Sequence, residues 1–266
     1  MRWLDALPSN RRRGSFPRCL SFMSGDRSTV ANRLTKLVGL PDVLIGPEHF
    51  WMPQGLPLLK SNGEWDKHPI AEAKLGEAAG FLCDEHREIL TSWWLAARER
   101  ANTPNWDIAS TCKIGGRKGF LLVEAKAHLA ELKKDGKPRA NRPSGGSVDN
   151  HKQIGVAIAS ASAALGETMG GWNLSLDSHY QLANRFAWAW KIASLGFPVV
   201  LVYLGFVKAT EMKTLGEPFL DYARWSQVVI DHCRGIIPEG AWGQEIKVGS
   251  VSVRPLIRVW EQEILA

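Results

Sequence analysis

The sequence predicts an α/β fold in which a mixed central sheet is flanked by helices. Within residues 105–128, a glycine-rich turn joins two strand-like runs. Residues 198–207 are apolar on both strand faces, which is typical of a central strand covered on both sides. Several other segments carry apolar residues at helical spacing, and helices that accompany such strands favour the α/β class.

The elements before the hairpin follow from composition and periodicity. Residues 1–24 are polar, rich in arginine and without a period, so we expect a loose extension followed by one domain over residues 25–266. A short helix is expected over residues 29–38, and the next stretch, interrupted by Pro and Gly, receives no assignment. A longer helix is predicted over residues 84–100 by an apolar stripe of Ile89, Leu90, Trp93, Trp94 and Ala97.

Two helices are predicted after the hairpin. Asp149 or Asn150 can cap the first helix, whose apolar face ends near Gly166. Ser178 can cap the second helix, which ends near Leu195.

The rest of the chain supplies strands and one more helix. The apolar run at 198–207 is expected to form the central strand. A helix is predicted around residues 222–233 and a strand over residues 248–259. Because proline cannot donate to a sheet ladder, Pro255 favours an edge position for that last strand.

The hairpin carries the residues that point to chemistry. A two-residue loop at positions 116–117 would set Asp107 opposite Lys126 and Ala109 opposite Glu124. Side chains alternate along a strand, so two carboxylates and an ammonium group converge on one face, and we expect them to lie in a cleft open to solvent. A slip of one residue would break this cluster. The opposite face carries Leu121, Val123, Ala125 and Ala127.

This pattern resembles the PD-(D/E)xK nuclease superfamily, with Asp107 as the first acid and Glu124-Ala125-Lys126 as the E-x-K element. The resemblance implies a restriction-endonuclease-like αβββαβ core with N- and C-terminal additions. It also implies hydrolysis of phosphodiester bonds in nucleic acid, with DNA expected before RNA. Oligomeric state stays open, and a homodimer is compatible with the sequence.

The resemblance assigns roles to the same residues. Asp107, Glu124 and the Ala125 carbonyl are expected to hold Mg²⁺, or Mn²⁺ in its place. Lys126 is expected to offset charge in the transition state and, with its pKa lowered by burial and a neighbouring cation, to help deprotonate the attacking water. Replacing Glu124 or Lys126 by Ala should then abolish cleavage and leave thermal unfolding unchanged or raised.

Other residues are candidates for substrate contact. Gln181, Arg185 and Trp188 share one stripe of the second predicted helix. Members of the superfamily often carry Gln followed four residues later by Tyr, and Arg185 stands where that Tyr would be. A stripe of this kind is also typical of a partly exposed surface. If the predicted helix before the hairpin contributes a further acid, Glu85 is the geometric choice, but the favoured interpretation is a solvated acid in the first helical turn.

A basic segment follows the second hairpin strand. Lys133 and Lys134 open it, and we expect them to contact phosphates beside the acidic site. The alternative is an ordinary solvated loop. The segment continues with Lys137, Arg139 and Arg142.

Composition excludes several other classes. The net charge of +6 permits an anionic partner without requiring one. No run approaches the ~20 apolar residues of a membrane span, and four scattered cysteines without C-x-x-C favour a reducing, cytoplasmic setting. The seven histidines lack the spacing of a zinc hydrolase.

Two rival functions remain open at this point. A non-catalytic nucleic-acid-binding or interaction module could keep the fold and use Asp107, Glu124 and Lys126 as a structural ion-pair cluster. A glycosidase, which also uses two carboxylates, lacks the expected pair of acids in separate aromatic-framed loops. A buried charge cluster is costly without a ligand, which counts against the non-catalytic module. Specific metal binding would distinguish the nuclease from that module.

Overall fold

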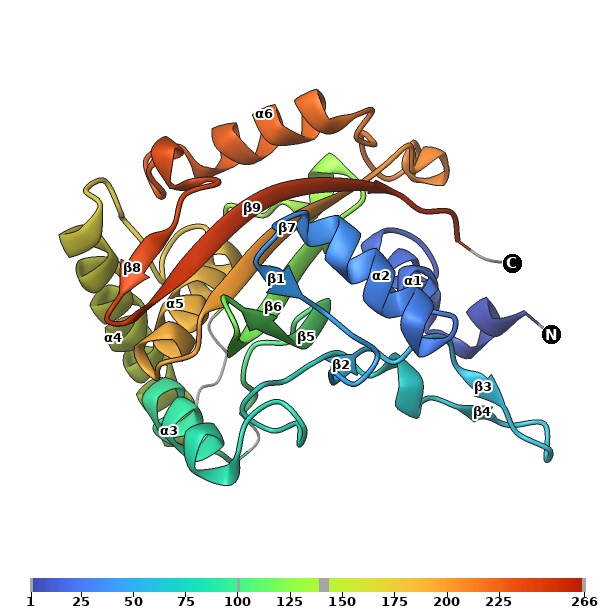
Figure 1. The fold of residues 1–266 in the computed structure, drawn as a ribbon, viewed down its shortest axis with the longest axis horizontal. Helices are drawn as coiled ribbons and strands as arrows, with labels where there is room; N and C mark the ends of the chain where they lie inside the picture. Colours follow the sequence, from blue (N-terminus) through green and yellow to red (C-terminus); the bar gives the residue numbers. More distant parts are fainter. Residues whose placement is uncertain (1, 100, 139–143, 265–266) are drawn as a thin grey trace.

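The computed structural model describes residues 2–99, 101–138 and 144–264. A mixed sheet crosses the centre of this part of the chain, with helices on both of its faces (Figure 1), so the predicted α/β class is confirmed. The sheet order is β1-β5-β6-β7-β9-β8, and β2 also pairs with β5. The helices are α1 Ser15–Phe22, α2 Arg27–Val38, α3 Asp84–Trp94, α4 Gly145–Thr168, α5 Tyr180–Ser194 and α6 Tyr222–Cys233. The strands are β1 Val43–Leu44, β2 Trp51–Met52, β3 Leu58–Leu59, β4 Trp65–Asp66, β5 Ile108–Ile114, β6 Arg117–Lys126, β7 Val199–Val207, β8 Ile246–Val248 and β9 Val251–Glu261.

The β5–β6 hairpin closes one residue earlier than predicted. Its loop is Gly115–Gly116, with φ of 56° and 79°. A type I′ turn needs positive φ at both central positions, which two glycines adopt freely and an arginine does not. The register therefore shifts by two, and Asp107 falls across from Glu124 rather than Lys126. A shift of two leaves every side chain on its expected face.

Parallel pairing extends the sheet beyond the hairpin. β7 runs parallel to β6 and to β9, and each of its residues is buried, as predicted for a central strand. α4 and α5 make the crossover from β6 to β7. Pro255 in β9 pairs with β7 on one side only, because β8 covers only residues 251–253 of β9. Its local position is therefore that of an edge, as expected.

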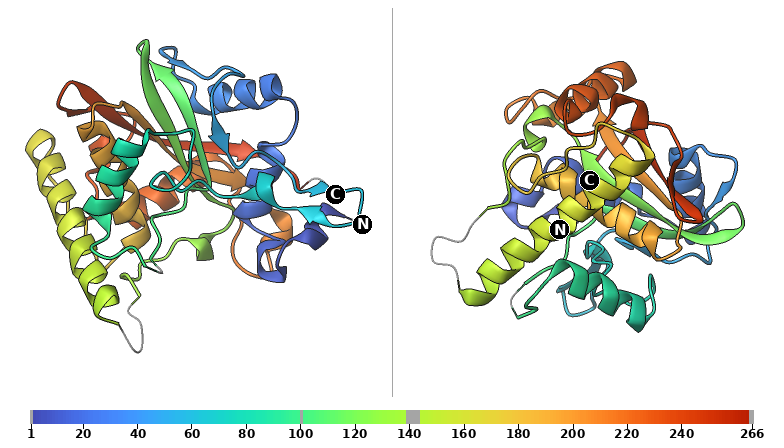
Figure 2. Two further views of the ribbon diagram at one scale, coloured as in Figure 1. Left: turned by 90° about the horizontal axis from the view of Figure 1, so that it is seen from below. Right: turned by 90° about the vertical axis from the view of Figure 1, so that its left-hand side faces the viewer.

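The two faces of the sheet carry separate apolar cores. Phe120 and Leu122 of β6 point toward α4, α5 and α6. Leu121, Val123 and Ala125 point the other way, toward α1 and α2. Figures 1 and 2 show these two groups of helices on opposite sides of the sheet. Glu124 and Lys126 follow the alternation of Phe120 and Leu122, so they belong to the α5 side.

The N-terminal segment is not the loose extension that was expected. Two short 3-10 helices, Trp3–Ala6 and Ser9–Arg11, lead into α1. The buried side chains of this segment pack against partly buried residues near β3 and β4. They are Trp3, Leu7, Phe16 and Leu20. Because these residues belong to a short 3-10 helix, to the residue that follows it and to α1, no single period reveals them in the sequence.

Helix boundaries differ from prediction where a remote partner decides them. α4 begins at Gly145 behind a Ser144 cap, whose hydroxyl accepts from Ser147 N–H. Asn150, predicted as a possible cap, instead bonds both backbone groups of Ala97. α3 ends at Trp94, earlier than expected.

No helix in the described ranges has the length and apolar character required to cross a lipid bilayer.

Candidate active site

Asp107 completes the sheet at the end of β6. The backbone pairing of β5 with β6 stops at Ile108, one position after Asp107 in the chain. Beyond that point, Asp107 Oδ2 accepts a hydrogen bond from Ala125 N–H at 2.7 Å. Trp106 would be the next partner of Ala125, but it gives both its backbone groups to Ala73. The N–H and C=O of a paired strand residue point to the same side, so the Ala125 carbonyl also faces this gap. A carboxylate and a backbone carbonyl therefore meet where the strand pairing ends.

Glu124 lies at the centre of a buried ion-pair network. Its Oε1 accepts a hydrogen bond from Lys126 Nζ, and its Oε2 accepts one from Arg185 Nε at 2.5 Å. The Arg185 guanidinium also donates to Asn184 Oδ1 at 2.8 Å and lies over the Trp106 ring, 4.7 Å from its centroid. Glu124 is 1% exposed, and Lys126 and Arg185 are 6% exposed. Two cations thus neutralise a carboxylate that is shielded from water.

The expected triad therefore gathers at one end of β6, but not in an open cleft. Lys126 and Glu124 are in direct contact, and Asp107 is bound to the residue between them. The expectation of a cleft open to solvent is corrected by the burial of Glu124 and Lys126. The cause is α5, which places the Arg185 side chain over the cluster.

The network keeps its charges. Burial raises the pKa of Glu124, but the charges of Arg185 and Lys126 outweigh burial and hold the pKa below its ordinary value. Burial lowers the pKa of Lys126, but Glu124 and Asp107 outweigh burial and hold that pKa above its ordinary value. The prediction of a lowered Lys126 pKa is therefore wrong. Its ammonium stays protonated, so it is suited to donating hydrogen bonds and offsetting negative charge, not to acting as a base.

Asp107 is the acid with an anomalous titration. Burial and the negative charge of Glu124 raise the pKa of Asp107 from 3.8 to about 7, although Lys126 and Ala125 N–H act in the opposite direction. The charge of Glu72 raises this pKa further. Shifts of this size concentrate at functional sites, although structural ion-pair networks also produce them.

Two further acids flank the cluster, and the sequence analysis missed both. The bridge between Ala73 and Trp106 sets Glu72 beside Asp107, where Asn105 Nδ2 donates to Glu72 Oε2 at 2.9 Å. On the other side, Glu131 Oε2 accepts a hydrogen bond from Ala127 N–H at 2.6 Å. Burial lowers the pKa of Lys126, while Glu124, Asp107 and, more weakly, Glu131 raise it. Both acids belong to irregular segments without a period, so no local signal marks them.

Glu85, the acid expected from the preceding helix, does not join the cluster. It is exposed in the first turn of α3. The charges that shift the pKa of Asp107 are those of Glu124, Lys126 and Glu72, and do not include Glu85. The alternative interpretation of Glu85 as a solvated acid near a helix N-terminus therefore fits the structure.

Residues 182–189 of α5 are all buried, which changes the interpretation of the polar stripe on this helix. Arg185 points into the carboxylate network, and Gln181 is half-buried at the start of the helix. Trp188 is 0% exposed, with its ring centroid 5.7 Å from that of Trp94 and 6.3 Å from that of Trp93. The expectation that Trp188 stacks on a nucleobase is therefore corrected: α3 covers it, and its ring is part of the core.

The start of the basic segment remains near the cluster. Lys133 and Lys134 are exposed. Burial lowers the pKa of His232 to about 4, and the charges of Lys134 and Lys126 contribute alongside His179, whose ring centroid is 4.9 Å away. Lys134 and Lys126 thus act on one histidine. Two other members of the segment, Arg139 and Arg142, lie outside the described residues.

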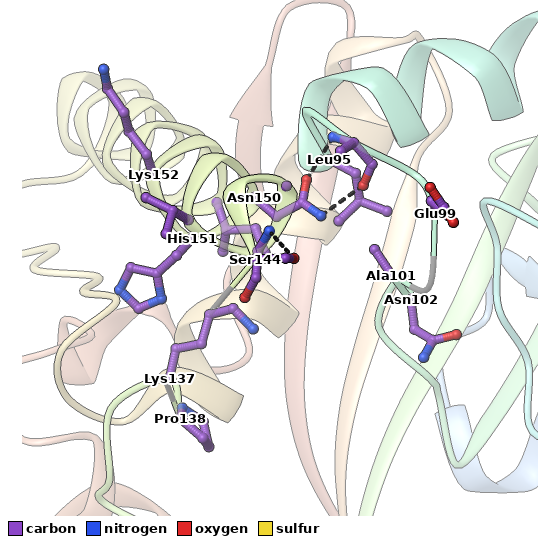
Figure 3. A pocket seen from close by; sticks show the side chains of 15 residues that line it. Leu95, Glu99, Ala101, Asn102, Lys137, Pro138, Ser144, Asn150, His151 and Lys152 are labelled. Carbon is purple, nitrogen blue, oxygen red and sulfur yellow. Dashed lines mark hydrogen bonds between the residues drawn. The ribbon is translucent and has the colours of Figure 1, made fainter. Parts of the chain in front are cut away.

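One cavity of about 940 Å³ is separate from the carboxylate cluster. It lies between a segment that includes Leu95, Ala97 and Asn102, the pair Lys137–Pro138, and the start of α4 (Figure 3). Its lining includes the basic residues Lys137, His151 and Lys152, but none of the triad. Lys137 therefore faces this cavity rather than the carboxylates, and the cavity is not the candidate active site.

The donor chemistry of the cluster suits a hard divalent cation. Carboxylate and carbonyl oxygens are the ligands that Mg²⁺ takes, and Asp107, Glu124 and Ala125 offer them in one place. Burial and then the charge of Glu124 raise the pKa of Asp107, and a bound cation would offset the repulsion between the two carboxylates. No group of three or more His, Cys, Asp and Glu side chains in the described ranges is arranged as a metal site, so the carbonyl would be needed to complete the set.

No family model, curated protein or solved structure matches this chain. The assignment of this cluster as a candidate active site therefore rests on the geometry and charges described above.

Proposed function

We propose that the chain is a metal-dependent nuclease of the PD-(D/E)xK type that hydrolyses phosphodiester bonds, with DNA preferred to RNA. The observation that carries this proposal is the meeting of Asp107, Glu124 and Lys126 where the β5–β6 ladder ends. With β3, β4 and α3 treated as insertions, the order α2, β1–β2, β5, β6, α4–α5 and β7 is compatible with an αβββαβ core. In such a core β1 and β2 would supply the first strand.

The chain's own residues would divide the work as follows. Asp107, Glu124 and the Ala125 carbonyl would hold Mg²⁺, which supplies a water of lowered pKa and polarises the phosphoryl oxygen. Lys126, which stays protonated, would stabilise negative charge on the phosphate during attack. Arg185 would be available as a phosphate partner once Glu124 is occupied, because a guanidinium matches phosphate geometry well. Gln181 and Lys134 remain candidates for substrate contact at the margins.

Lys126→Met is expected to reduce DNA cleavage by roughly 10²–10³-fold, the usual loss when one group that stabilises transition-state charge is removed. Steady-state cleavage of a labelled duplex in Mg²⁺ measures the effect. Lys113→Met, an exposed change near the far end of the hairpin, is the matched control and should keep full activity. Cleavage that survives Lys126→Met, or that resists a chelator, would contradict the proposal.

Metal binding is tested on its own by calorimetry. The wild-type protein should bind Mg²⁺ or Mn²⁺ at one site, and Asp107→Ala should lose that binding. Equal heats for the two proteins would remove the metal site from the proposal.

A second candidate is a non-catalytic binding module, and one observation favours it. Both oxygens of Glu124 are already bonded, to Lys126 and to Arg185, so this carboxylate is satisfied without metal. In such a module the cluster fixes α5 against β6. The binding-module hypothesis predicts neither Mg²⁺ binding nor cleavage. The cleavage assay and the calorimetry therefore distinguish it from the nuclease.

A further inference from the structure

Residues 11–15, which we call the arginine strap, are attached at both ends to the acids that flank the candidate site. At one end, Arg11 forms an ion pair with Glu72, the neighbour of Asp107. At the other end, Ser15 N–H donates to Glu131 Oε1 at 3.2 Å. The strap therefore runs from the Asp107 side of the cluster to the Lys126 side.

Two further observations place the strap close to the carboxylates. Gly14 has φ of 84°, which glycine adopts without strain, and a Cβ atom there would lie 2.6 Å from Glu131 Oε1, so the strap backbone lies against the Glu131 carboxylate. One helical turn later, the pKa of Cys19 is raised well above its ordinary value, first by burial and then by the four acids of the site. These acids are Asp107, Glu131, Glu72 and Glu124.

The three arginines of the strap differ in how far they are engaged. Arg11 is paired with Glu72, and Arg12 bonds the backbone oxygens of Leu7 and Asp5. Arg13 is exposed and makes no hydrogen bond or ion pair with the described residues.

The charge of Arg13 also acts on Glu211, but Glu211 already has a stronger partner in Arg18. Burial opposes ionisation of Glu211, but Arg18, which donates two hydrogen bonds, and more weakly Arg13, hold its pKa below the ordinary value. Arg13 is therefore a cation of the strap that is free to bind an external anion.

We propose that the arginine strap is the nucleic-acid contact on one side of the site, with Arg13 binding a backbone phosphate. This inference rests on the proposed function and deepens it. A phosphodiester chain carries a charge at every residue and needs cations along its path. Arg13 would supply one on the α1 side, and Lys134 one on the side of His232, with the carboxylate cluster between them.

Binding of labelled single-stranded and duplex oligonucleotides over a salt series tests the strap. All proteins carry Asp107→Asn, so that DNA stays intact when Mg²⁺ is present. Arg13→Ser should weaken binding severalfold for every sequence and make log K less steep in log salt by about one unit. Arg13→Lys should keep the slope. The control is Arg117→Ser, at the opposite end of β6 from Lys126 and about 30 Å from it along the strand. This change should alter neither the affinity nor the salt slope.

The outcomes separate this inference from the proposed function. Unchanged or tighter binding by Arg13→Ser, in a protein whose wild type cleaves DNA, overturns the strap alone. A wild type that binds no nucleic acid overturns both proposals. A wild type that binds without cleaving, and whose salt slope falls on Arg13→Ser, supports the strap and removes the nuclease.

Discussion

Glu124→Gln is expected to lower the free energy of unfolding by about 3–5 kcal/mol, because it removes the only carboxylate in direct contact with the buried cations Lys126 and Arg185 among the described residues. It should also abolish cleavage if the proposed function is correct. The stability effect reverses the sequence-based expectation, which treated the cluster as crowded acids whose removal relieves repulsion. Denaturant unfolding of the two proteins measures the difference.

Two variants make this prediction specific. Lys126→Met should cost less, because Glu124 keeps Arg185 as a partner. The double variant Glu124→Gln with Lys126→Met should be more stable than Glu124→Gln alone, since one unpaired cation is gone. A change of no more than about 0.5 kcal/mol on Glu124→Gln would show that the network is solvated and would refute its structural role.

Asp107 is expected to make the folded protein less stable as the pH rises. Its pKa is about 7 in the folded protein and near 3.8 when unfolded, so the folded state holds this proton over a wider range. The contribution of Asp107 to stability is therefore fully present below pH 4 and is lost as the pH approaches 7. The loss is on the order of 2–4 kcal/mol, from about 1.4 kcal/mol per unit of pKa shift.

Asp107→Asn should remove this slope and raise stability at neutral pH. Denaturant unfolding from pH 4 to pH 8 measures the slope for both proteins. Asp42→Asn is the contrasting control, because the hydrogen bond from Arg254 lowers the pKa of Asp42 and gives its contribution the opposite sign. Parallel pH profiles for wild type and Asp107→Asn would contradict the assignment. Mg²⁺ should flatten the wild-type profile if it binds the ionised carboxylate.

The hairpin shows how far sequence reasoning reached. Alternation correctly assigned Leu121, Val123 and Ala125 to one face, because the parity of a strand survives a register shift of two. The predicted loop was off by one, because it placed Arg117 at a central position that requires positive φ, which the two glycines adopt freely. Backbone conformation decided it, in favour of Gly115–Gly116.

The parts that could not be predicted depend on contacts between remote segments. Glu72 lies beside Asp107 through a single bridge in an irregular stretch, and Arg11, which pairs with Glu72, stands 61 residues earlier in the chain. The burial of Trp188 depends on α3, which lies in front of the hairpin in the chain. Local periodicity carries no information about such pairs, so the stripe on α5 read as a surface when it is core.

The parallel crossover between β6 and β7 also affects how the protein is made. During synthesis, the segment carrying Asp107, Glu124 and Lys126 emerges before Arg185, which is 61 residues beyond Glu124. A nascent chain that ends before α5 has neither the guanidinium that neutralises Glu124 nor the β7 strand that flanks β6. β9 must then add to the far side of β7. The acidic site therefore forms late, when most of the chain has left the ribosome, and shorter translation products should lack it.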